Sequence, residues 1–114
     1  MHKEEGFIVL LNKLLTAVEI ILRDETCREY CRDLPKLVDH LIFIFESIDD
    51  DNSRVLALRV IASMNLSLEK KVEICKREEF KRMLELLVDK NQDLAKEIIR
   101  TVKCFLGSQE TAEK

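Results

Sequence analysis

Cysteine and histidine are the residues of this chain that most readily bind a metal, so their spacing is considered first. The set comprises Cys27, Cys31, Cys75, Cys104, His2 and His40. Cys27 and Cys31 lie four residues apart, the spacing of one helix face. A structural zinc site needs clustered ligands such as paired Cys-x-x-Cys motifs, and the chain has none. We therefore expect reduced structural thiols and no metal, with a regulatory disulfide as the alternative.

The acidic run from Asp49 to Asp51 is a second candidate for metal chemistry. It lacks the remaining ligands of a calcium-binding EF-hand loop, so we interpret it as an acidic surface loop. The sequence carries no catalytic motif and no cofactor-binding motif. We expect a protein that is not an enzyme and that needs no cofactor.

A row of basic residues offers a binding surface instead. Lys96, Arg100 and Lys103 follow the i, i+4, i+7 spacing of one helix face, and Arg59 occupies nearly the same place in an earlier segment. Such a row would bind an acidic or phosphorylated peptide through charge-assisted hydrogen bonds. The alternative is an ordinary solvated face, which Glu97 would help to balance.

Composition limits both the fold and the partners. The chain has 114 residues, 46% of them hydrophobic and 36% charged, with only two glycines and one proline. This balance is typical of one folded domain, and the lack of tight-turn dipeptides predicts helices. A net charge of −3 argues against general nucleic-acid binding. No apolar run is long enough to cross a membrane, and acidic residues interrupt the start of the chain, so we expect no signal peptide and an intracellular protein, cytoplasmic or nuclear.

Residues 7–23 predict a helix with an unusually wide apolar face. Phe7, Leu11, Leu14 and Val18 belong to its central stripe, and the same stripe includes Leu15 and Leu22. Leu10, Ala17 and Ile21 widen it on one side, which leaves a narrow polar strip of Asn12, Thr16, Glu19 and Arg23. An apolar arc of this width indicates contact with more than one neighbour. We expect part of it to contact a partner, a second copy or further repeats of the same kind, unless short helices fold back and cover it.

Further helices are expected along the rest of the chain. Asp24 or Thr26 is a candidate N-cap for the helix that follows, and Ser53 is a candidate N-cap for a later helix. Pro35 suits the first turn of the helix that lies between them. Gly107 is expected to stop the last helix, which leaves residues 108–114 as a frayed tail. The segments are 24–33, 34–48, one after Ser53, 69–77, 78–90 and 93–106.

The order of a short helix, a middle helix, a polar break and a long helix occurs twice. Leu41 and Leu87 are 46 residues apart, and Leu58 and Ile98 are 40 apart. A period of about 40 to 46 residues is the signature of helical solenoids. We therefore predict one domain over residues 1–107, with a partial repeat at 7–23 and full repeats at 24–67 and 68–107.

Three stretches resemble the armadillo-repeat family. "EKKVEICKREEFKRMLELLVDKNQDLAKEIIRTVKCFLGS" is similar to its three-helix unit, "DLPKLVDHL" to the start of its second helix, and "ALRVIASMNLS" to its third. The glycine that the family places before the second helix is missing in both repeats, so the HEAT repeat, with two helices per unit, is a close second. The resemblance implies an all-α, right-handed α-solenoid of about two and a half repeats.

The same resemblance implies non-catalytic protein recognition, as a scaffold or adaptor. Asn65 matches the asparagine that lines the family's concave groove, where Arg59 and Ser63 would also face. In the alternative interpretation Asn65 bonds a nearby helix end. Ile61 stands where peptide-binding members carry tryptophan, which argues against a receptor for nuclear-localisation signals. Two other functions stay open, a homodimerisation module that uses the 7–22 helix and, as a weaker alternative, an RNA-binding repeat that uses the basic row.

Overall fold

The computed structural model describes residues 2–90 and 92–113, and every regular element in these ranges is an α-helix. The predicted all-α class is therefore confirmed. Among these residues no helix combines the length and apolar character needed to cross a membrane. The elements are α1 (His2–Ile21), α2 (Glu25–Arg32), α3 (Pro35–Ser47), α4 (Asp51–Ser63), α5 (Leu68–Cys75), α6 (Glu78–Lys90) and α7 (Gln92–Glu113).

Side-chain caps fix where several helices begin. The carboxylate of Asp24 accepts a hydrogen bond from the Cys27 amide at 3.0 Å, which confirms Asp24 as a cap for α2. The expectation for Ser53 was wrong, because Asp50 caps α4 and Ser53 lies within the helix. The buried Ser53 hydroxyl instead lies 2.6 Å from Oδ1 of Asn12 in α1. This contact also corrects the outward position predicted for Asn12.

The ends of the first and last helices differ from the prediction. Helix α1 begins at His2 and ends at Ile21, whereas the sequence predicted 7–23. Helix α7 continues through Gly107 to Glu113, so the helix stop predicted at Gly107 is not found. An interior glycine costs a helix only about 1 kcal/mol, and the residues that follow Gly107 are compatible with helix. Asn91, part of the predicted polar break, and Lys114, at the end of the predicted tail, lie outside the described residues.

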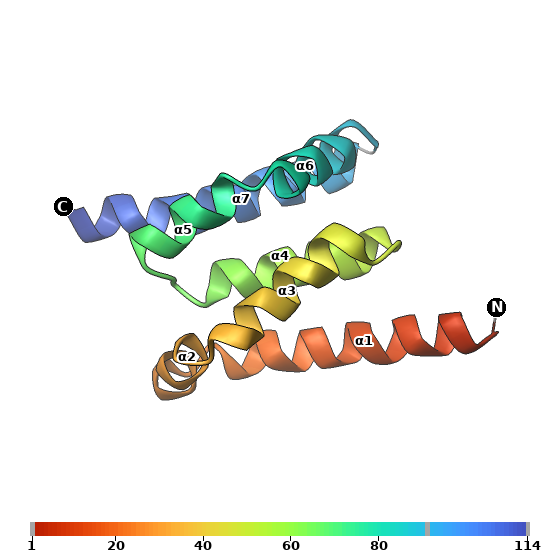
Figure 1. Ribbon diagram of the computed structural model, residues 1–114, viewed down its shortest axis with the longest axis horizontal. Coiled ribbons are helices and arrows are strands. Elements are labelled where there is room, and N and C mark those ends of the chain that lie inside the picture. The colour runs from red at the N-terminus through yellow and green to blue at the C-terminus, as the bar shows by residue number, and fades with distance from the viewer. Residues whose placement is uncertain (1, 91, 114) are drawn as a thin grey trace.

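The long helices α1, α4 and α7 pack one against the next, and two further helices cover this row. Helix α3 packs on α4 and helix α6 packs on α7, while α3 also contacts α6 (Figure 1). The short helices α2 and α5 contact α3 and α6 respectively. Helix α2 has no buried residue, and the buried hydrophobic side chains of the other helices form one continuous core. Its fully buried members include Leu22, Phe45, Leu58, Ile61, Met64, Ile74, Leu87 and Ile98.

Candidate functional site

Arg59, the predicted centre of the basic surface, is engaged by two carboxylates. Its guanidinium lies 3.0 Å from Oε1 of Glu19 in α1 and 3.3 Å from Oε1 of Glu97 in α7. Its Nε also donates to Glu19 at 3.1 Å. The side chain therefore connects all three helices of the row. Because both carboxylates neutralise its charge, Arg59 is poorly placed to bind an anionic peptide.

Ser63 and Asn65, the two other residues predicted to face the groove, have local contacts at the end of α4. The Ser63 hydroxyl donates to the carbonyl of Arg59 at 2.8 Å, within the same helix. Asn65 is exposed with a φ of 53°, and its own carbonyl accepts a hydrogen bond from Arg32 at 3.2 Å. Asparagine is one of the few residues that adopt this left-handed conformation after a helix. The left-handed backbone suits Asn65 to the end of α4, and the contact with Arg32 uses its backbone carbonyl rather than its side-chain amide.

The remaining predicted basic residues all lie exposed on α7. Lys96 and Arg100 are on the solvent side of this helix, and Lys103 borders a groove between α6 and α7. The basic row on α7 is therefore exposed to solvent. Arg59 does not extend this row, because its charge is paired with Glu19 and Glu97.

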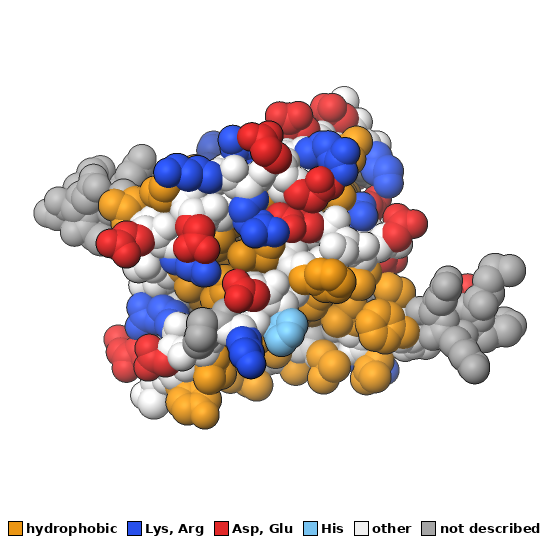
Figure 2. All heavy atoms as spheres, in the orientation of Figure 1, with side chains coloured by type: hydrophobic (Ala, Val, Ile, Leu, Met, Phe, Trp, Pro, Cys, Tyr) orange, Lys and Arg blue, Asp and Glu red, His pale blue; other side chains and the backbone are white. Residues whose placement is uncertain are grey.

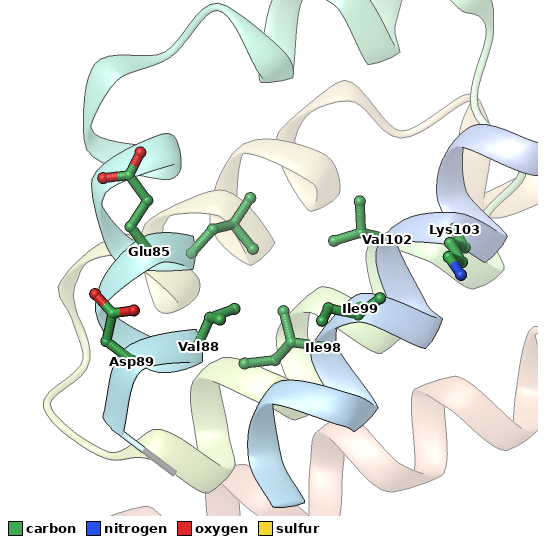
Figure 3. A pocket seen from close by; sticks show the side chains of 8 residues that line it. Glu85, Val88, Asp89, Ile98, Ile99, Val102 and Lys103 are labelled. Carbon is green, nitrogen blue, oxygen red and sulfur yellow. The ribbon is translucent and has the colours of Figure 1, made fainter. Parts of the chain in front are cut away.

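The groove between α6 and α7 has a volume of about 400 Å³ and an apolar floor. Figure 3 shows Val88 of α6 and Ile98 of α7 pointing toward each other across it. Glu85 and Asp89 line the α6 side, and Lys103 lies at the α7 side. The floor consists of Leu84, Val88, Ile98, Ile99 and Val102. The sequence analysis did not predict this groove. The signal that could have indicated it is the adjacent pair Ile98 and Ile99, which widens the apolar face of α7; in the structure Ile98 is buried and Ile99 is half exposed.

The predicted apolar interface on α1 divides into two faces. Leu11 and Val18 are partly buried and pack against the core, whereas Phe7 and Leu14 are each 55% exposed. Leu10 and Ile21 are exposed to a similar extent. Figure 2 shows hydrophobic side chains gathered over the N-terminal half of α1 and the adjoining part of α3. A large apolar surface of this kind indicates an interaction site.

The cysteines and acidic residues form no metal site among the described residues. All four cysteines are free. Desolvation and the neighbouring Asp24 carboxylate raise the pKa of the Cys27 thiol above its ordinary value, which lowers its reactivity. Asp50 and Asp51 line a polar depression of about 570 Å³ together with Lys90 and Asp93.

Comparison of the chain with protein-family models, with curated proteins and with solved structures yields no match. The resemblance to armadillo and HEAT repeats therefore rests on the sequence patterns alone.

Proposed function

We propose that this chain is a non-catalytic protein-interaction module, built as a short armadillo-like stack, that binds an amphipathic helix of another protein in the α6–α7 groove. The observation that carries the proposal is the apolar floor of this groove, which lies between helices α6 and α7. Docking of an amphipathic helix into an apolar groove is a recurring mode of peptide recognition, in which anchors repeat at i, i+3, i+4 and i+7.

The size and lining of the groove fit two or three such anchors. A cavity of about 400 Å³ lies at the lower end of the range for ligand pockets, and its lining by valine, leucine and isoleucine favours aliphatic side chains. Each leucine-sized anchor that leaves water contributes about 2 kcal/mol. Three anchors contribute about 6 kcal/mol and association itself costs several kcal/mol, so the apolar contacts alone support a weak complex with a dissociation constant of about 1 mM or more.

The charges at the rim specify the orientation of the partner. Glu85 and Asp89 lie four residues apart on α6, so both carboxylates occupy one edge of the groove. A helix with lysine or arginine next to its apolar stripe would pair with this edge, and an acidic residue would pair with Lys103 on the other. Rim charges act mainly on association rate and on the choice of partner.

Two features support the proposed repeat architecture. Leu41 and Leu87 were aligned by sequence spacing, and both are buried, as are Leu58 and Ile98. Helix α3 covers α4 in the same way that α6 covers α7. In a stack of this kind the last pair of helices presents a face on which a further helix can pack.

A selection from a displayed library of helical peptides tests the function. Wild-type protein should enrich peptides with apolar residues at helical spacing and a basic flank, and the Ile99→Glu variant should lose them. Val72→Glu, at an exposed apolar position on α5 outside the groove, is the matched control and should retain them. Enrichment of acidic or phosphorylated peptides that depends on Lys96 and Arg100 would contradict the proposal.

A further inference from the structure

The outward face of α1 repeats with the period of a coiled-coil seam. Phe7, Leu10, Leu14, Ala17 and Ile21 are separated by steps of three and four residues, and all five are exposed. The four large side chains are 50 to 57% exposed. A strict three–four alternation keeps one row of apolar residues facing a single neighbouring helix. This row is called the α1 seam below.

Among the described residues, no helix buries the α1 seam. Helix α4 packs against α3 and helix α7 packs against α6, whereas the main neighbour of α1 is α4 alone. Leu15 and Leu22 point into that contact and are buried. The α1 seam lies on a different side of the helix, and Figure 2 shows that hydrophobic surface continues from α1 onto α3, where Phe43 is 59% exposed.

We infer that α1 pairs with α1 of a second copy, antiparallel and about a two-fold axis near Leu14. In this arrangement Phe7 lies opposite Ile21 of the second copy, Leu10 lies opposite Ala17, and Leu14 meets its own equivalent. Away from the axis, the large side chain of Leu10 therefore faces the small side chain of Ala17. Phe7 at one end of the seam faces Ile21 at the other end. A two-fold contact must be complementary to itself, and this row satisfies that condition.

The area and charge of the surface fit a dimer. The four large side chains of the α1 seam and Phe43 of the adjoining α3 each expose on the order of 100 Å². Together they provide roughly 500 Å² per copy and about 1,000 Å² per pair, the smallest area expected of a specific interface. From Phe7 to Ile21 the only charged side chains are Lys13 and Glu19, and Glu19 is engaged by Arg59. Interface cores are depleted of charge in this way.

The α1 seam is separate from the α6–α7 groove. A variant can therefore abolish dimerisation without abolishing the proposed helix binding, and a groove variant can do the reverse. Sedimentation equilibrium of the full chain should give twice the monomer mass of 13.4 kDa at micromolar concentration. Leu14→Glu should weaken association at least about 100-fold, because two carboxylates would face each other across the axis. Ile99→Glu, in the groove, should leave the dimer unchanged. Circular dichroism of both variants should show wild-type helicity, since both positions are exposed.

A cross-linking experiment tests the geometry of the pair. In a chain with Cys75→Ser and Cys104→Ser, the Leu14→Cys variant should form a covalent dimer under mild oxidation, and Thr16→Cys, on another side of the helix, should not. A monomer at all concentrations up to about 500 μM would overturn the inference. Species that grow beyond a dimer, or association lost in Ile99→Glu as well as in Leu14→Glu, would show head-to-tail docking of α1 into the groove of a second copy and would equally overturn it.

Discussion

At the scale of single residues, Arg59 connects three helices through ion pairs. One guanidinium joins α1 through Glu19 and α7 through Glu97 while belonging to α4. The side chain is 38% exposed and Glu97 is 41% exposed, so solvent screens both pairs. The contribution of these ion pairs to stability is therefore modest.

Replacement of Arg59 by methionine should lower the free energy of unfolding by about 0.5 to 1 kcal/mol, because it removes two partly screened ion pairs and leaves Glu19 without its partner. Urea unfolding at low and high salt measures this, and the difference from wild type should shrink as salt rises. Arg82→Ala, which removes an exposed ion pair within α6, is the matched control and should change stability little. A larger loss in Arg82→Ala than in Arg59→Met would refute this assignment.

Asp24 should make the start of α2 sensitive to acid. The hydrogen bond from the Cys27 amide is the main cause that lowers the pKa of Asp24 from its ordinary 3.8. Since the folded pKa is the lower one, the capping contribution is complete above pH 3.8 and is lost as pH falls through the folded value. Hydrogen exchange at the Cys27 amide should therefore gain an acid-induced acceleration below about pH 4. Asp24→Asn keeps a capping oxygen without a charge and should abolish this dependence; an unchanged profile would contradict it.

At the scale of elements, residues close together in sequence predict where a helix forms. Contacts between residues distant in sequence decide which side of each helix is buried. Asp24 caps α2 through an amide three residues away, so inspection of neighbours suffices. Ser53 could not be assigned in this way, because its hydroxyl contacts Asn12, 41 residues earlier. The same applies to Glu19, which sequence spacing placed on an outward polar strip and which Arg59 holds inward.

Helix α1 should tolerate and benefit from alanine at Gly6. A Cβ atom at this position would meet nothing within 4 Å, and glycine in a helix interior is less favourable than alanine by roughly 0.5 to 1 kcal/mol. Gly6→Ala should raise the helix content and the thermal midpoint slightly when measured at low protein concentration. A lower midpoint would mean that another part of the protein occupies this side of α1.

At the scale of the whole molecule, the two surfaces proposed for interaction lie at opposite ends of the helical row, the α1 seam at one end and the α6–α7 groove at the other. A short helix followed by two longer helices occurs twice, in α2 to α4 and in α5 to α7, and this order was readable from sequence because it depends on local signals. The groove was not, since it depends on how α6 and α7 pack against each other. Ile61, where peptide-binding armadillo proteins carry tryptophan, is fully buried, so it cannot contact a peptide on the surface of α4.

The most direct test of the interaction proposal is chemical-shift mapping by nuclear magnetic resonance with one helical peptide from the selection. Amide signals of residues 84–89 and 98–103 should shift with a single dissociation constant, and Ile99→Glu should abolish the shifts. Shifts centred on Arg59 and Asn65, or the absence of shifts in the α6–α7 groove at saturating peptide, would contradict the account.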